Sequence, residues 1–178
     1  AHYADIPQAW KFARNKDWQS DVIDQSVADW PDFFASRVVA PLWERGYRGF
    51  FLDTMDSYRL AAQFNEQAQQ DGLVRVIETL HQRFPGIRLI LNRGFDIVPR
   101  VRDKIEMVAA ESLYRGWNAR TQRYEDVTPQ DRAWLQAQLR TIQQRDGLPV
   151  LAIDYAPPHD RALARATAAR IAADGFIP

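Results

Sequence analysis

The sequence predicts an α/β fold, a (β/α)8 barrel, on three observations. Short apolar runs alternate with longer segments of helical period, which is the pattern of βα units and of a parallel sheet. The apolar runs are nearly continuous, which suits strands buried on both faces. Four of these runs end in a polar or acidic residue, and in a parallel barrel the carboxyl ends of the strands meet on one face.

Four apolar runs give the clearest strands, and two shorter runs are weaker candidates. The clearest lie at 50–52, 87–91, 107–110 and 150–153, and the weaker ones at 22–23 and 176–177. A closed barrel needs eight strands, in about 250 residues. We therefore expect the chain to be an N-terminally truncated fragment that lacks the first two strands of the barrel. Residues 1–7 resemble neither a start nor a leader, and 175–178 resemble a last strand that is just beginning.

Segments between these runs have the apolar period of helices. A first helix is expected from a capping Asp29 to Gly46, and a last one over about 160–173. A second is closed by Pro85, and a third begins at Thr128. The expected core-facing positions of the first three are Trp30, Phe34, Val38 and Leu42; Leu73, Val76, Ile77, Leu80 and Phe84; and Trp134, Ala137 and Ile142.

No linker or low-complexity stretch interrupts the chain, so residues 1–178 are expected to form a single domain. An open doubly wound sheet is the alternative architecture, because it also places sites at the carboxyl ends of strands. That fold usually carries a glycine-rich phosphate turn, and this sequence has none.

The composition excludes several classes of function. The 23 basic and 23 acidic residues cancel, so a nucleic-acid partner and electrostatic binding to a membrane are not expected. No apolar run approaches the ~20 residues of a membrane span. There is no cysteine, and the three histidines (His2, His81 and His159) have no zinc spacing. Serine-hydrolase and P-loop motifs are missing too, so carboxylate chemistry without a metal or cofactor remains.

The stretch 49–58 combines a buried strand with two carboxylates and a tyrosine. It reads Gly-Phe-Phe-Leu-Asp-Thr-Met-Asp-Ser-Tyr, so Asp53 and Asp56 follow the strand three residues apart. Glycosidic cleavage needs one carboxyl group to protonate the leaving oxygen and a second to act as nucleophile or base, and these two satisfy that need. The alternative is that either aspartate caps the following helix.

Two further strands end in polar side chains. Glu111 follows the run 107–110 and is a second candidate for acid–base chemistry, and its alternative is a structural ion pair with Arg93 or Arg115. Asn92 and Arg93 supply an amide and a guanidinium at the same face. These groups suit sugar hydroxyls or the orientation of a carboxylate.

Aromatic segments predict the walls of a binding groove. Asp154 and Tyr155 follow the strand at 150–153, and two prolines behind them stiffen the loop. The long connection 114–124 is rich in aromatic and arginine side chains, and Tyr114 and Trp117 offer faces on which sugar rings stack. For Trp117 the alternative is that it packs the loop against the protein.

Four motifs, in this order, resemble glycoside hydrolase family 114. They are Gly-Phe-Phe-Leu-Asp-Thr-Met-Asp-Ser-Tyr (49–58), Leu-Asn-Arg-Gly-Phe (91–95), Ala-Ala-Glu-Ser-Leu-Tyr (109–114) and Leu-Ala-Ile-Asp-Tyr-Ala-Pro-Pro (151–158). The resemblance covers essentially the whole chain. It implies a (β/α)8 barrel and endo-hydrolysis of α-1,4-linked galactosamine-rich polymers. It also implies that Asp53 and Glu111 are the catalytic pair, with Asp56 and Tyr58 lining the cleft.

The expected partner is therefore a cationic amino-sugar polysaccharide, to which a groove lined by Asp53, Asp56, Glu111 and Asp154 is complementary. The resemblance implies a periplasmic or secreted location and association with other exopolysaccharide biosynthesis proteins. We favour Glu111 as acid/base and Asp53 as nucleophile, although the sequence does not order them.

Two other functions compete with hydrolysis. The same acidic and aromatic groove would serve a non-catalytic polysaccharide-binding domain of a biosynthesis or secretion assembly. A polysaccharide deacetylase is the third hypothesis, but such enzymes usually hold a metal with histidine and aspartate, and the histidine spacing gives it no support.

Overall fold

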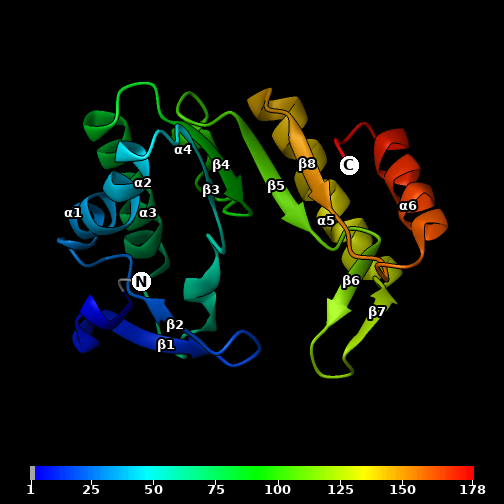
Figure 1. Cartoon of the computed structure of the whole chain (residues 1–178), viewed down its shortest axis with the longest axis horizontal. Helices are drawn as coiled ribbons and strands as arrows, with labels where there is room; N and C mark the ends of the chain where they lie inside the picture. The colour runs from blue at the N-terminus through cyan, green and yellow to red at the C-terminus, as the bar shows by residue number, and fades with distance from the viewer. Residues whose placement is uncertain (1–2) are drawn as a thin grey trace.

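The computed structural model describes residues 3–178 as alternating strands and helices (Figure 1). The strands are β1 (Lys11–Asn15), β2 (Ser20–Ile23), β3 (Gly49–Leu52), β4 (Arg88–Asn92), β5 (Met107–Glu111), β6 (Arg115–Asn118), β7 (Arg123–Asp126) and β8 (Val150–Ile153). The α-helices are α1 (Trp30–Phe34), α2 (Ala40–Glu44), α3 (Glu66–Arg83), α4 (Val98–Val101), α5 (Pro129–Thr141) and α6 (Arg161–Ala173). Short 3-10 turns cover Tyr3–Asp5, Gln8–Trp10 and Ser57–Leu60, and π turns cover Ala35–Val39 and Ile142–Asp146.

Four parallel strands, in the order β3-β4-β5-β8, form the central sheet. Their carboxyl ends point to the end of the molecule where the two hairpins, β1–β2 and β6–β7, lie (Figure 1). Helices fill the connections between the strands, so the predicted α/β class is confirmed. Within residues 3–178 the sheet stays open and does not close into a barrel.

The two faces of this sheet differ in burial. The face that packs against the helices is almost fully buried, and it carries Leu89, Leu91, Val108, Ala110, Val150 and Ala152. The other face is more open, and there Phe51 is 42% exposed. The expectation of strands buried on both faces therefore holds for one face only, because in this part of the chain no second layer covers the other.

Two expectations about strands are corrected, and another is confirmed in part. Residues 22–23 lie in β2, which pairs antiparallel with β1 and stays outside the central sheet. Ile177 makes a single parallel bridge to Leu151 of β8, which is the beginning of a strand where the sequence indicates one. The connection 114–124, expected as a loop, is largely the hairpin β6–β7, in which Trp117 lies opposite Tyr124. Short hairpins with exposed sides show little apolar patterning, which is why the sequence did not indicate these two.

The first helix is continuous but contains a π turn. The extra residue in this turn moves the buried positions by one, so that Ala35 and Val39 face the core while Val38 is only half-buried. Asp29 precedes the helix, but its side chain makes no capping hydrogen bond. The expected end at Gly46 is confirmed by its left-handed backbone, φ +95°.

The remaining helices follow the sequence closely. All the apolar positions predicted for α3 are buried, and Asn65 caps it by accepting from the amide of Ala68. Thr128 and Asp160 cap α5 and α6 in the same way. The expected orientation of Trp134 is wrong, because α5 turns Leu135 and Leu139 to the core and leaves Trp134 50% exposed.

Helix α3 also holds the segment between β2 and α1. The buried Gln69 donates to Asp24 Oδ1 at 2.6 Å and accepts from the amide of Gln25 at 2.9 Å. One turn along the helix, Gly72 touches the same segment, and a Cβ atom placed there would overlap the carbonyl oxygen of Gln25. The glycine is therefore required for this close approach of helix and loop.

Gly72→Ala is expected to destabilise the protein by about 2–3 kcal/mol, the upper part of the range for overpacking. An alanine inside an ordinary exposed helix would instead stabilise it by about 1 kcal/mol. Urea unfolding measures the difference. Gly49→Ala is the control, because its Cβ would lie 4.0 Å from the Arg88 carbonyl oxygen and meet no clash. A Gly72→Ala variant as stable as wild type would contradict this account of the contact.

Candidate active site

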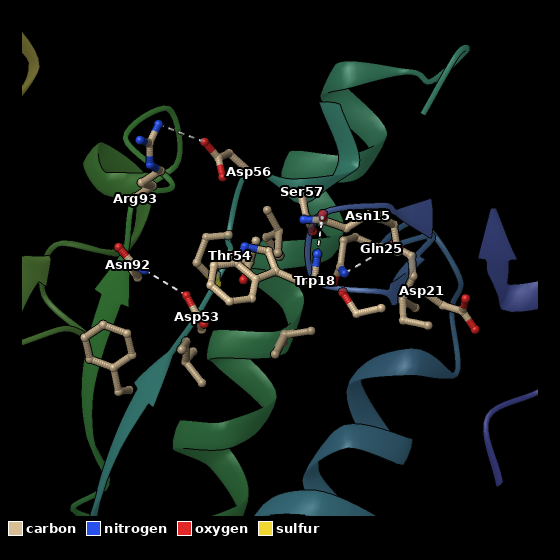
Figure 2. A pocket seen from close by; sticks show the side chains of 18 of the residues that line it. Asn15, Trp18, Asp21, Gln25, Asp53, Thr54, Asp56, Ser57, Asn92 and Arg93 are labelled. Carbon is tan, nitrogen blue, oxygen red and sulfur yellow. Dashed lines mark hydrogen bonds and ion pairs between the residues drawn. The ribbon is translucent and has the colours of Figure 1, made fainter. Parts of the chain in front are cut away.

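One amide group joins the two predicted catalytic carboxylates. Asn92 Nδ2 donates to Asp53 Oδ1 at 2.7 Å and to Glu111 Oε1 at 3.2 Å, and Figure 2 shows the first of these bonds. Asn92 is 5% exposed, and its Oδ1 atom has no hydrogen-bond partner among the described residues. The orientation of the amide follows from this, since turning it over would place Oδ1 against both carboxylate oxygens.

The sheet register brings these three side chains to one face. Leu52 pairs with Leu91, so Asp53 and Asn92 follow on neighbouring strands and point the same way. Asn92 in turn pairs with Ala109, and Glu111 lies two residues further along β5, on the same side. All three therefore stand at the carboxyl end of the more open face of the sheet.

A left-handed residue follows each of the three side chains. Thr54, Arg93 and Ser112 have φ values of +58°, +63° and +62°, although none of them is glycine. The amides of Arg93 and Ser112 still bond across the sheet, to the carbonyls of Ala109 and Ile153, at 2.8 and 2.9 Å. A non-glycine residue in this region costs roughly 1–2 kcal/mol. Each of these three residues directly follows a site side chain. Such strain persists only where the surrounding contacts fix the backbone, so the direction in which the chain continues after each strand is fixed here.

Neither structural alternative for the carboxylates is found. Arg93 lies 3.7 Å from Asp56, and Arg115 pairs with Asp126, so the two expected ion-pair partners of Glu111 are engaged elsewhere. Asp56 precedes the 3-10 turn Ser57–Leu60, but its side chain caps nothing.

Tyr155 adds a hydroxyl beside Glu111. Burial raises the pKa of Tyr155, and the charge of Glu111 together with its hydrogen bond to the tyrosine raises it further. The phenol is therefore protonated at neutral pH and lies close to the glutamate. An amide and a phenol thus stand beside Glu111.

These side chains surround an open cavity of about 840 Å³. Six of the predicted site residues line it: Asp53, Asp56, Asn92, Arg93, Glu111 and Tyr155. The hairpin β1–β2 and the loop after it form the opposite wall, and α1 and α3 contribute an apolar part (Figure 2). The volume is in the upper part of the roughly 300–1,000 Å³ typical of ligand sites.

Four other predicted site residues do not line this cavity. Tyr58 is buried in the core, 2% exposed, with its ring edge against Phe64. The hydroxyl of Tyr114 bonds to Asp174, behind the sheet, between α5 and α6. Trp117 lies on the hairpin β6–β7, where it packs edge-to-face on Tyr124 with 4.9 Å between the ring centroids. Trp117 thus packs within its own hairpin and stays 40% exposed, so the expected alternative, in which it packs the loop against the rest of the protein, is not found either.

Asp154 is the fourth, and the register explains its position. Ile153 pairs with Glu111, so the next residue, Asp154, points to the opposite face of the sheet. There its carboxylate accepts from the amides of Leu113, Tyr114 and Arg115 at 2.6, 2.7 and 2.9 Å. Burial raises the pKa of Asp154, and these three amides only partly offset that effect. Asp154 thus fixes the turn that follows Glu111.

Asp154→Asn is expected to destabilise the protein by about 1–3 kcal/mol, because a neutral amide leaves at least one buried N–H without an acceptor. Thermal unfolding and limited proteolysis of the 115–126 hairpin would measure the loss. The control is Asp32→Asn, whose side chain is 79% exposed and whose partner Arg83 is 40% exposed. An exposed ion pair is worth at most about 1 kcal/mol, so the control should change little. Equal effects of the two substitutions would contradict this role of Asp154.

The sequence reasoning missed one exposed aromatic residue at the cavity. Trp18 lies between β1 and β2 and is 69% exposed. The available signal was a single aromatic residue within the polar turn 15–19.

The described residues contain neither a group of metal-ligating side chains nor a membrane-spanning helix. In residues 3–178 no three histidine, aspartate or glutamate side chains are grouped so that they could hold a metal ion. The helices of the same part of the chain include none that is long and apolar enough to cross a membrane.

A parallel α/β sheet with two carboxylates beside each other at its strand ends is the arrangement of a glycoside hydrolase. The chain belongs to glycoside hydrolase family GH114, whose family model matches residues 1–178. The resemblance expected from the four sequence motifs is thereby confirmed.

Solved structures agree with this assignment. The glycoside hydrolase domain of PelA from Pseudomonas aeruginosa is 38% identical, with a TM-score of 0.87 over 98% of this chain and 69% of that one. A variant of that domain with a glutamate replaced by alanine matches over the same shares, at 37% identity and a TM-score of 0.86. Ega3 from Aspergillus fumigatus, solved with galactosamine, shares the fold at 16% identity and a TM-score of 0.63, over 86% of this chain and 54% of that one. No curated protein is significantly similar to the chain.

Proposed function

We propose that this chain is the domain of an endo-acting glycoside hydrolase that cleaves an α-1,4-linked exopolysaccharide rich in galactosamine and N-acetylgalactosamine. Asp53 and Glu111 are its catalytic pair in this proposal. The observation that carries it is the amide of Asn92, which binds both carboxylates at the edge of the cavity.

We further propose a retaining mechanism, which a short separation of the two acids supports. One oxygen of each carboxyl group lies within hydrogen-bond distance of Asn92 Nδ2, at 2.7 and 3.2 Å, so these two oxygens are at most about 6 Å apart. Carboxyl groups lie about 5–5.5 Å apart in retaining enzymes and about 6.5–9.5 Å apart in inverting ones. Glu111 protonates the leaving oxygen while Asp53 attacks the anomeric carbon. Glu111 then removes a proton from the water that displaces Asp53, and both carboxyl groups return to their starting states.

The charge around the cavity supports a cationic substrate. Three carboxylates on the strand side line it (Asp53, Asp56 and Glu111), against one guanidinium, that of Arg93, while Asp21 on the opposite wall is paired with Lys11 and Arg14. A free amino group on the sugar is attracted by such a wall, and an acidic sugar is repelled. We further propose a periplasmic or secreted location beside other exopolysaccharide biosynthesis proteins.

The test is release of reducing ends by the protein from a deacetylated α-1,4-galactosamine polymer. An α-1,4-galacturonan is the control, because it keeps the linkage and reverses the charge. We expect oligosaccharide products from the galactosamine polymer and none from the galacturonan. Binding of the galactosamine polymer without release would overturn the proposal and support a polysaccharide-binding domain.

A further inference from the structure

Trp18 differs from the other exposed tryptophans in having no aromatic support. Among the described residues it makes no ring contact, although its side chain is 69% exposed. Trp117, 40% exposed, packs against Tyr124, and Trp134, 50% exposed, packs against Phe95 with 6.3 Å between the ring centroids. An indole with this much free surface has a whole face available for a ligand.

Trp18 lies where its free face can contact a molecule bound at the carboxylates. It lines the cavity that holds Asp53, Asn92 and Glu111, but it comes from the opposite wall. In Figure 2 it lies between the hairpin residues Asn15 and Asp21 and the end of β3, where Asp53 and Thr54 stand. A molecule bound against the carboxylates therefore extends towards the indole.

The hairpin holds Trp18 in this position. Asn15 Oδ1 accepts from the amides of Asp17 and Trp18 at 3.0 and 3.2 Å. Arg14 donates to Asp21 Oδ1 at 2.9 Å across the two strands. A platform fixed before the ligand arrives loses less conformational entropy on binding than a free loop does.

We propose that Trp18 is a stacking subsite for a hexosamine unit of the substrate, beyond the unit whose bond is broken. The inference rests on the proposed function. The apolar face of a pyranose ring packs on the indole, and the ammonium group of an unacetylated unit is attracted by the same π-system. A cavity of about 840 Å³ has room for several linked units, as an endo-acting site requires.

The test separates binding from cleavage. In the Glu111→Gln background, binding of galactosamine oligomers is followed by tryptophan fluorescence and by isothermal titration calorimetry, with and without Trp18→Ala. We expect Trp18→Ala to remove most of the fluorescence change and to raise the calorimetric Kd about tenfold. In the otherwise wild-type enzyme it should raise KM for the polymer by a similar factor and leave kcat within about twofold. Trp18→Phe, which keeps a ring, should retain most of the affinity and guards against misfolding of the Ala variant.

Trp134→Ala is the matched control, since it removes an exposed indole outside the cavity, and it should bind as wild type does. Unchanged Kd and KM in Trp18→Ala would overturn the subsite while leaving hydrolysis intact. Absence of hydrolysis by wild type, with Trp18-dependent binding, would overturn the proposed function and uphold the subsite.

Discussion

Glu111→Gln and Asp53→Asn are each expected to lower kcat on the galactosamine polymer about 10²- to 10⁴-fold. These substitutions keep the size of the side chains but remove the proton donor in one case and the nucleophile in the other. Reducing-end release measures the loss. Circular dichroism and thermal unfolding would show that the variants are folded.

Asp56→Asn is the matched control within the same cavity. Asp56 lines the site and lies 3.7 Å from Arg93, but neither hydrogen bond of Asn92 reaches it. We expect its loss to raise KM and to lower kcat less than tenfold. Equal losses of kcat in all three variants would contradict the assignment of Asp53 and Glu111 as the pair.

An aryl galactosaminide oligomer with a good leaving group shows which carboxylate is the acid and which is the nucleophile. The aryl group departs without being protonated, so Glu111→Gln should regain most of the rate of the first step if Glu111 is the acid. Asp53→Asn should regain none, because the attacking group is missing. The reverse result would exchange the two assignments.

Much of this architecture could be predicted from the sequence because strand and helix signals are local. The apolar runs before Asp53, Asn92 and Glu111 fix both the strands and the residue that ends each of them. Since the carboxyl ends of parallel strands meet at one edge of the sheet, the proximity of these three residues could be predicted from the sequence.

The face to which each strand end points could not be predicted. It depends on register, and one residue of difference reverses a side chain. Asp154 looked equivalent to Asp53 and Glu111 in sequence, yet it follows the partner of Glu111 by one position and so faces away. The predicted positions of Tyr58 and Tyr114 in the cleft are wrong for another reason. A tyrosine next to a site motif can pack in the core as well as contact a ligand, and both of these are buried.

Contacts between distant segments were also out of reach. The wall that carries Trp18 belongs to the hairpin 11–23, whereas the first site motif begins only at Gly49, and neither stretch of sequence indicates that the two are in contact. The contact depends on Gln69 and Gly72 of α3, which hold the segment after the hairpin. The role of a buried glutamine or of a glycine inside a helix can be inferred only once the residues that they contact are known.

Asn92→Asp is expected to lower kcat at least 100-fold, although it changes a single NH2 group to an oxygen. The new carboxylate would take the place of a donor that lies 2.7 Å from Asp53 and 3.2 Å from Glu111. A third acid between Asp53 and Glu111 would share protons with both of them, so the proton that Glu111 has to deliver would no longer be confined to Glu111. The distinct roles of nucleophile and acid are then lost.

The control is Asn65→Asp, the same chemical change at the N-cap of α3, where aspartate caps as well as asparagine. Its kcat should stay within twofold of wild type. Asn92→Ala separates the effect of the added charge from the loss of the two Asn92 hydrogen bonds, because it removes both bonds without adding a carboxylate. Its kcat should fall less than that of Asn92→Asp. A lower kcat in the alanine variant would mean that the two hydrogen bonds matter more than the charge repulsion. Because the amide of Asn92 is the one group among residues 3–178 that is bonded to both acids, an Asn92→Asp variant with wild-type kcat would contradict the paired site altogether.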